Sequence, residues 1–434
     1  MMLRKTLLAF SIAAVSANTF AAAFQLAEHS ASGLGRAFAG DAAVAENASV
    51  VARNPALMSQ FNTTQFSVAA TYVEPDVSLK GISAPAYSNA AAMNDDSIAP
   101  SAIIPAAYFV MPINDKFAFG LGVFSNFGLA TDFEKDYAAG QLAGKTEITT
   151  ANLNAAWSYK VNEQFAVAAG VSYVYADAKI IRHAGAGLPA ALQASYGTTF
   201  GVTSSTEAAN LEGDDHGFGW NVGVTYEPTK GHLFGLHYRA ATDLTFNGNY
   251  SNELPVVLNS ANSIALGGET IPGELDLELP ATIEFSGSHQ LNQTVGLHYS
   301  VLLTQWNSFD TLQAYSGDMS KPVFAKKEEF SNAIRYAIGA DYQVSAKLKL
   351  RAGIAYDETP ADKHLSISIP DTNRLWLSTG ASYQLTDSSS IDLGPAYLKG
   401  EKQNFTETDN LGGAWEFEAE GNALLLSAQY NVCF

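Results

Sequence analysis

Hydrophobic and polar residues alternate with a period of two along most of the chain, from Phe66 to the last residue, Phe434. Every odd-numbered position in 165–175 is apolar, and the same alternation recurs in 295–304 and 348–356. Such segments have one apolar face and one polar or small face, which is typical of β-strands that lie between two environments. The chain beyond residue 63 is therefore predicted to be all-β.

The lengths of the predicted strands and connections favour a membrane barrel over a soluble sandwich, although a sandwich would also show alternation. Many strands reach the roughly nine to eleven residues that a tilted strand needs to cross a bilayer, and aromatic residues recur near their ends. Short connections, such as 112–115 and 345–347, alternate with long ones, such as 184–215 and 248–274. We therefore predict a transmembrane antiparallel β-barrel of about 14 strands over residues 64–434.

The last segment, 424–434, has the pattern of a strand that faces lipid. Every second residue is apolar, and the chain ends on the aromatic Phe434. An amphipathic edge strand of a soluble sheet would look the same. Because the same alternation is repeated upstream, the lipid-facing interpretation is favoured.

The first 21 residues predict export of the protein. Arg4 and Lys5 precede an apolar run, 7–15, that only Ser11 interrupts, and small residues follow at 21–23. This is the pattern of a secretory signal peptide over residues 1–21, with cleavage after Ala21. No later stretch offers the roughly 18 consecutive apolar residues of a membrane-spanning helix. The predicted location is the outer membrane of a Gram-negative bacterium.

Residues 22–63 differ from the rest of the chain. They are rich in Ala, Gly, Ser and Asn, and they show neither a sustained alternation nor a helical stripe. Their glycines Gly33, Gly35 and Gly40 do not match the dinucleotide-binding fingerprint, so turns and close packing are the expected roles. A compact irregular segment ahead of a barrel predicts an N-terminal hatch that plugs the lumen and controls passage.

Composition and motifs exclude several functions. The formal net charge of −19 argues against binding of nucleic acid, whose phosphates require clustered Lys and Arg. The single cysteine, Cys433, rules out an internal disulfide framework, and the eight histidines form no metal-binding motif. No GxSxG motif is present, although a barrel hydrolase need not use that motif. We therefore predict no catalytic site, no cofactor and no bound metal.

Two predicted outer loops contain apolar residues, which is unusual for segments that face water. Together they could form a groove for an apolar ligand, or they could simply cap the mouth of the barrel. The candidate groove residues are Leu188, Leu192, Phe200, Leu254 and Val257.

Two cations near predicted strand ends, Arg182 and Lys326, are candidates for binding an anionic head group. Either could instead contact lipopolysaccharide or pair with a nearby acid such as Glu328.

A set of ordered motifs resembles the long-chain fatty acid transporter (FadL) family. The run 24–56 resembles the hatch of this family, with GLGRA at 33–37 and NPA at Asn54, Pro55 and Ala56. Further matches, in order, are VEPDV at 73–77, SNFGLATDF at 125–133, YADAKIIRHAG at 175–185, GFGWNVG at 217–223, GNYS at 248–251 and SISIPDTNRLWLS at 366–378. The resemblance covers essentially the whole mature chain.

The resemblance implies that a hydrophobic substrate is captured at a groove between two long outer loops. It further implies that the substrate passes to a tighter site inside the barrel, where its carboxylate lies near Ser125, Arg182 and Lys326. The expected partners are thus a long-chain fatty acid or a similar hydrophobic ligand, together with lipid of the outer membrane.

The resemblance also implies how the ligand leaves. It places an inward kink of one strand, with a lateral opening of the wall, at Asn126, Phe127 and Gly128. A small movement of the first hatch residues around Phe24 would weaken the inner site and release the ligand into the membrane. The predicted function is uptake of long-chain fatty acids. Uptake of other hydrophobic compounds such as aromatic hydrocarbons, a lipid hydrolase and a receptor barrel remain alternatives.

Overall fold

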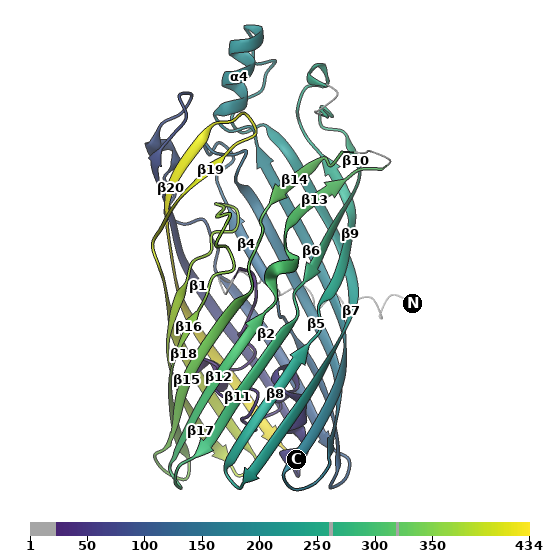
Figure 1. Ribbon diagram of the computed structural model, residues 1–434, viewed down its shortest axis with the longest axis vertical. Coiled ribbons are helices and arrows are strands. Elements are labelled where there is room, and N and C mark those ends of the chain that lie inside the picture. The colour runs from purple at the N-terminus through teal and green to yellow at the C-terminus, as the bar shows by residue number, and fades with distance from the viewer. Residues whose placement is uncertain (1–22, 260–263, 318–320) are drawn as a thin grey trace.

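The computed structural model describes residues 23–259, 264–317 and 321–434, and these residues form a closed antiparallel β-barrel (Figure 1). The ring closes where β1 (Gln65–Ser83) pairs with β20 (Ala414–Cys433) on one side and with β2 (Ala102–Pro112) on the other. Fourteen strands cross the barrel in this part of the chain, as predicted. The predicted signal peptide, 1–21, lies outside the described residues.

Several of the crossing strands are built from two segments. The remaining strand segments are β3 (Phe117–Phe124), β4 (Gly128–Asp132), β5 (Gly144–Lys160), β6 (Phe165–His183), β7 (Glu207–Thr229), β8 (His232–Arg239), β9 (Thr242–Ser251), β10 (Thr270–Leu279), β11 (Thr282–Gln290), β12 (Val295–Thr304), β13 (Thr311–Tyr315), β14 (Phe324–Lys327), β15 (Ala333–Gln343), β16 (Leu348–Asp357), β17 (Arg374–Thr386), β18 (Ser389–Gly400) and β19 (Gln403–Thr408). The β13–β14 hairpin and β19 extend the wall at the end that carries the long loops (Figure 1).

The helices are short. They are α2 (Ala31–Leu34), α3 (Val50–Arg53), η1 (Pro55–Gln60), η2 (Ala90–Met93), α4 (Gly187–Tyr196), η3 (Val256–Leu258) and η4 (Trp306–Ser308). Within the described residues, none of them is long and apolar enough to cross a bilayer. The longest, α4, stands beyond the rim at the long-loop end (Figure 1).

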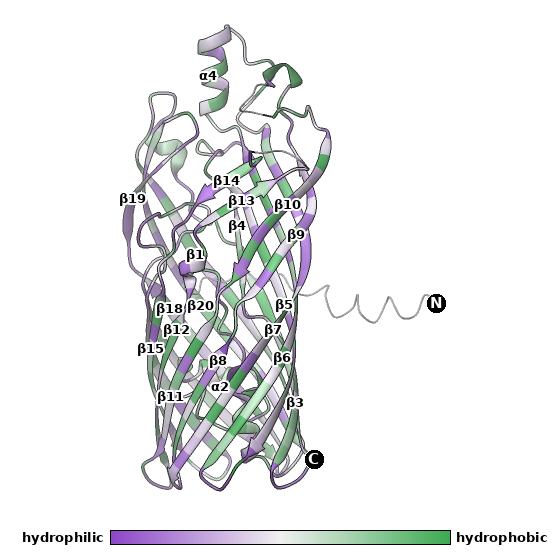
Figure 2. Cartoon of the chain, turned by 45° about the vertical axis from the view of Figure 1, so that its right-hand side comes forward, coloured by the Kyte–Doolittle hydropathy of each residue, from purple (hydrophilic) through white to green (hydrophobic). Residues whose placement is uncertain are grey.

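Alternate residues of the strands face the outside and the lumen, as the periodicity predicts. In β20 the outward residues Leu424, Leu426 and Tyr430 are exposed, whereas Leu425 and Gln429 between them are buried. The apolar outer positions recur on neighbouring strands (Figure 2). An apolar outer surface on a closed barrel is what a lipid environment requires, since closing the sheet pairs most of the backbone groups that an open sheet would leave at its edges.

Residues 23–64, called the N-terminal segment below, lie inside the barrel. The side chain of Ser30 begins α2 by accepting a hydrogen bond from the Gly33 amide at 3.0 Å. At the start of η1, the side chain of Asn54 accepts from the Ala56 amide at 3.1 Å, and Pro55 occupies the first helical position. These caps give a segment without periodicity a defined shape.

The N-terminal segment packs against the wall through two apolar clusters. Leu26, Leu34 and Phe38 belong to one cluster, and barrel residues such as Trp376 and Leu398 complete it. A second cluster joins α3 and η1 to the strands on the other side, through Val51, Leu57, Met58, Tyr108 and Phe124. The lumen in this half is therefore a packed core.

Glycines of the wall let the backbone of the N-terminal segment approach closely. A Cβ atom at Gly353 of β16 would lie 2.1 Å from the carbonyl carbon and oxygen of Arg36. Similarly, a Cβ atom at Gly235 of β8 would lie 1.8 Å from the carbonyl oxygen of Ala42. Backbone atoms cannot move aside as a flexible side chain can, so these positions require glycine.

We predict that Gly353→Ala disturbs the seating of the N-terminal segment, because the added methyl group meets the backbone of Arg36. Overpacking of this kind costs about 1–3 kcal/mol. Thermal melting and protease sensitivity of the purified protein should both reveal the loss. The control is Gly421→Ala, whose added Cβ would lie 3.5 Å from Val77, an ordinary contact. Equal behaviour of the two variants would refute the steric argument.

Candidate ligand-binding site

A cavity of about 1400 Å³ opens at the long-loop end of the barrel. Its lining includes the predicted residues Arg182, Lys326, Leu188 and Leu254, together with Phe324. Sequence positions separated by more than a hundred residues thus converge on one space. The predicted Ser125 does not line this cavity.

Lys326 of β14 has a carboxylate partner inside the cavity. Its Nζ lies 3.0 Å from Oε1 of Glu407 in β19, and it also donates hydrogen bonds to Ser368, at 2.6 Å, and to Ser366. The acid that binds Lys326 is therefore Glu407, and not the neighbouring Glu328 considered from the sequence. An incoming anion would compete with Glu407 for the ammonium group.

Arg182, at the end of β6, is held by neutral groups. Its guanidinium donates to the carbonyl oxygens of Lys145 and Ile181, at 3.0 and 2.8 Å, and to Oγ1 of Thr146 at 3.1 Å. It also lies over the ring of Phe324, 5.8 Å from the centroid. Among the described residues, no carboxylate lies within 4.0 Å of it. A buried guanidinium without a direct ion pair favours an anionic ligand.

An apolar cluster continues from the cavity into the barrel. Leu142, Ala209 and Tyr250 line the cavity and also belong to this cluster. Its deeper part is aromatic and includes Phe24, Phe127, Trp306, Phe309 and Phe330.

Phe24 of the N-terminal segment lies at the centre of these rings. Its centroid is 4.5 Å from that of Trp306, 5.5 Å from that of Phe309 and 6.0 Å from that of Phe127. The start of the N-terminal segment therefore occupies the inner end of the apolar space.

The barrel wall is interrupted beside Phe127. The pairing of β3 with β2 ends at Val123 and Ala107, so residues 102–106 of β2 pair only with β1 among the described strands. On the other side of the bend, Phe124 of β3 pairs with Asn152 of β5, and Gly128 of β4 pairs with Thr149 of β5. The chain advances by four residues along β3 and β4 but by three along β5, which leaves one extra residue in the bend.

The N-terminal segment supplies hydrogen bonds at this interruption. The amide of Leu26 donates to the carbonyl oxygen of Asn126 at 2.7 Å, and the amide of Gly128 donates to that of Phe24 at 2.8 Å. Residue Gln25 forms an isolated bridge with Phe127. The segment thus takes the place of a strand next to the predicted kink residues.

Ser125 lies in the same bend and contributes to its shape. Its hydroxyl donates to the carbonyl oxygen of Thr150 at 2.5 Å, and its own carbonyl oxygen lies 3.1 Å from Nε2 of His29. The Ser125 hydroxyl therefore helps to hold the bend through the Thr150 carbonyl group, and Ser125 is not among the residues that line the cavity.

The predicted groove residues fall into different environments. Leu192 is buried in a small cluster with Ala184 and Val202, so it forms the core of the first loop. Leu188 and Phe200 pack against this cluster, as does Leu258 from the second loop, which confirms that the two loops meet. Val257 is 68% exposed and does not belong to this cluster.

The NPA residues lie far from the cavity and fasten the N-terminal segment to the wall. The side-chain amide of Asn54 donates to the carbonyl oxygens of Ala42, at 2.8 Å, and of Val224, at 3.1 Å. Pro55 and Ala56 are buried. The structure gives these residues an anchoring position.

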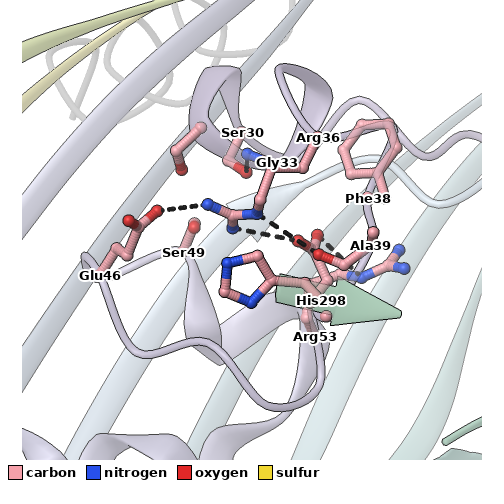
Figure 3. Close-up of polar contacts among 12 residues, drawn as sticks. Ser30, Gly33, Arg36, Phe38, Ala39, Glu46, Ser49, Arg53 and His298 are labelled. Carbon is pink, nitrogen blue, oxygen red and sulfur yellow. Dashed lines mark hydrogen bonds and ion pairs between the residues drawn. The ribbon is translucent and has the colours of Figure 1, made fainter. Parts of the chain in front are cut away.

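A largely buried charge network anchors the same part of the segment. Figure 3 shows Arg36 pointing toward Glu46, with a distance of 2.7 Å between Nη1 and Oε2. Glu46 also lies 2.7 Å from Lys349 and 3.1 Å from Arg351, both of β16. Although burial opposes ionisation, Arg351, Lys349 and Arg36 hold the pKa of Glu46 well below its ordinary value. Arg53 adds an ion pair with Glu284 of β11 at 2.8 Å.

The described residues contain no group of three or more His, Cys, Asp or Glu side chains arranged to hold a metal ion.

The fold and the site define an outer-membrane barrel with an internal segment and a ligand cavity at one end. The chain belongs to the family described as outer membrane protein transport protein (OMPP1/FadL/TodX), whose model matches residues 12–434. The family resemblance inferred from the motifs is confirmed.

Relatives of known name cover almost the whole chain. The 47 kDa outer membrane protein of Pasteurella multocida is 44% identical, over 98% of both chains. A long-chain fatty acid transport protein of Escherichia coli O6:H1 is 41% identical, over 99% of this chain and 98% of its own. The predicted location in the outer membrane of a Gram-negative bacterium is thereby confirmed.

Solved structures share the fold. The crystal structure of a Pseudomonas aeruginosa FadL homologue covers 95% of this chain and 99% of its own, with a TM-score of 0.84 and 23% identity. The Pseudomonas putida toluene transporter TodX covers 95% of this chain and 100% of its own, with a TM-score of 0.70 and 17% identity. At these identities the comparison concerns the architecture alone.

We predict that Glu46→Gln loosens the N-terminal segment, because the change leaves several cations without their shared carboxylate. Breaking such a pair costs on the order of 3 kcal/mol. Hydrogen exchange in residues 31–60 should speed up at neutral pH. The control is Glu163→Gln, which removes only an exposed pair with Lys160.

The wild-type protein should show the corresponding pH dependence. A carboxyl group whose pKa is lowered on folding stabilises the fold above its ordinary pKa, and this contribution is lost as the pH falls through the lowered value. Protection of residues 31–60 should thus persist down to about pH 5 and weaken in stronger acid. Loss of protection between pH 8 and pH 6 would contradict this assignment.

Proposed function

We propose that this protein takes up long-chain fatty acids across the outer membrane. The observation that carries this proposal is the cavity in which Arg182 and Lys326 lie together, and whose apolar lining continues into the aromatic cluster around Phe24. A charged head and a long apolar tail match these two environments. The name of the Escherichia coli relative, a long-chain fatty acid transport protein, supports the same substrate class.

The tail supplies most of the binding free energy. Each methylene group removed from water contributes about 0.8 kcal/mol, so a long chain in the aromatic cluster binds strongly without any polar contact. The meeting of Leu188 and Phe200 with Leu258 at the mouth supports first capture between the two loops. Leu254, which lines the cavity, would then lead the tail inward.

The head group is oriented by the two cations. A carboxylate can accept charge-assisted hydrogen bonds from the ammonium group of Lys326 and from the guanidinium of Arg182. Since Lys326 is already paired with Glu407, binding is an exchange of one carboxylate for another. Ser125, by contrast, is proposed as a residue that holds the bend.

Residues 22–63 are proposed to act as a hatch whose parts have different roles. The charge network and the Asn54 contacts hold the later part to the wall, whereas Phe24 and its neighbours are held by apolar contacts and by hydrogen bonds to 126–128. A ligand tail that displaces Phe24 would free the bend at Asn126, Phe127 and Gly128. Release through the interruption between β2 and β4 would deliver the ligand into the membrane.

Uptake of aromatic hydrocarbons by the same architecture is the second candidate, since the toluene transporter TodX shares the fold. A neutral ring makes no use of the two cations, whereas a carboxylate uses both. The cavity therefore favours the fatty acid.

We predict that Lys326→Met weakens binding of oleate about ten- to a hundredfold, because a charge-assisted hydrogen bond contributes about 1.5–3 kcal/mol. Calorimetric titration of the delipidated protein in nanodiscs would measure this loss. Lys327→Met is the matched control, because Lys327 also lines the cavity but is exposed and pairs with Glu329 instead of Glu407. Equal affinities of the two variants would exclude Lys326 from the head-group site.

We also predict that Gly128→Trp abolishes uptake of labelled oleate by cells while leaving a measurable binding affinity, because the indole blocks the interruption in the wall. Val171→Trp is the control, since Val171 is 65% exposed and lies on β6, which is paired with β5 and β7 on its two sides. Normal uptake by the Gly128 variant would rule out the lateral route.

A further inference from the structure

Glu328 is a buried acid close to the cations of the cavity, and it forms no ion pair with the described residues. It follows β14, two residues after Lys326, and its side chain is 1% exposed. Neither carboxyl oxygen has a hydrogen-bond partner among the described residues. Its backbone amide donates to the carbonyl oxygen of Asp310 at 2.8 Å, so its position is fixed. A buried polar group without a partner is rare and calls for an explanation.

The charged groups that face Glu328 come from three strands. Lys326 of β14 and Arg182 of β6 attract its negative form, and Glu407 of β19 opposes it. Both cations already donate to other groups, Lys326 to Glu407 and Arg182 to neutral oxygens. The Glu328 carboxyl group is thus the member of this cluster that has no hydrogen-bond donor among the described residues.

Burial raises the pKa of Glu328 to about 7, against the opposing effect of Lys326 and with a further contribution from Glu407. The next residue behaves in the opposite way. Glu329 is paired with Lys327 and His364, and these hydrogen bonds lower its pKa. Two adjacent glutamates therefore differ in their readiness to take up a proton.

The anionic head group of a ligand changes the balance of charge in this cluster. When an anionic head group reaches Arg182 and Lys326, it adds a negative charge next to Glu407 and Glu328. Groups that interact this closely titrate together, and the least solvated carboxyl group is the one that is most easily neutralised. Glu328 is that group, because it is buried and no donor of the described residues reaches its oxygens.

We propose that Glu328 is a selectivity residue of the head-group site, whose carboxyl group takes up one proton from water when an anionic head group binds to Arg182 and Lys326. The inference rests on the proposed function, because it assigns the head group to these two cations. A neutral head group brings no charge and requires no proton. The site thereby distinguishes anionic from neutral ligands by proton uptake as well as by direct contact.

The proposal predicts that the affinity for an anionic ligand falls as the pH rises. Below the pKa of Glu328 the carboxyl group is already neutral and the anion binds without a proton. Above it, binding must draw a proton from solution, so affinity falls as the pH rises. If binding raises the pKa by about one unit, affinity falls up to about tenfold between pH 6 and pH 9.

The test uses the full-length protein in nanodiscs and octanesulfonate, an alkyl anion that does not titrate in this range. Calorimetric titrations at pH 7.5 in two buffers of different ionisation enthalpy give the number of protons taken up per ligand. We expect about half a proton for the wild-type protein. We expect none for Glu328→Gln, in which an amide of the same shape replaces the neutral acid. Octan-1-ol should bind without proton uptake to either protein.

Glu329→Gln is the matched control, and it should keep the wild-type proton uptake because the Glu329 carboxylate is half-buried and already paired with Lys327 and His364. Thermal melting of each variant shows that it is folded. Proton uptake that persists in Glu328→Gln, or an octanesulfonate affinity that does not vary with pH in the wild-type protein, would overturn the inference. Failure of octanesulfonate and oleate to bind at any pH would instead overturn the proposed function.

Discussion

The structure depends on the need to satisfy backbone hydrogen bonds where no water is present. Each unpaired amide or carbonyl in the hydrocarbon region costs several kcal/mol, so a strand wall must close on itself. Here β1 and β20 close the ring over most of their length. At the interruption between β2 and β4, Phe24 and Leu26 supply hydrogen-bond partners to Gly128 and Asn126. Wall and N-terminal segment are therefore one hydrogen-bonded structure at this point.

The charge network around Glu46 and the cavity differ in how their charges are compensated. In the network, the carboxylate of Glu46 is shared among Arg36, Lys349 and Arg351. In the cavity, Arg182 has no carboxylate within ion-pair distance among the described residues, and the nearby Glu328 carboxyl group accepts no hydrogen bond from them. A shared carboxylate suits anchoring, whereas groups without a charged partner can be completed by a ligand.

The fold could be predicted from the sequence because the two-residue period is a local signal that a barrel repeats on every strand. Arg182 and Lys326 can be proposed from the sequence for a similar reason, since few basic residues occur near the strand ends and both match the family motifs. The pairing of Lys326 with Glu407 could not be predicted, because the two residues lie about 80 positions apart in the sequence. The segment around Glu407 also has the composition of an exposed loop. Ser125 carried the right motif, but the direction of its hydroxyl depends on the bend, which tertiary contacts determine.

The anchored part of the N-terminal segment has a consequence for the permeability barrier of the cell. Glycine contacts at Gly235 and Gly353, together with the Arg53–Glu284 ion pair, hold it against the strands β8, β16 and β11 of the wall. If a ligand moves only the residues around Phe24, no continuous water-filled path opens along the barrel axis. A cell could then admit amphiphiles through this protein without leaking ions or nutrients, and without admitting hydrophilic antibiotics.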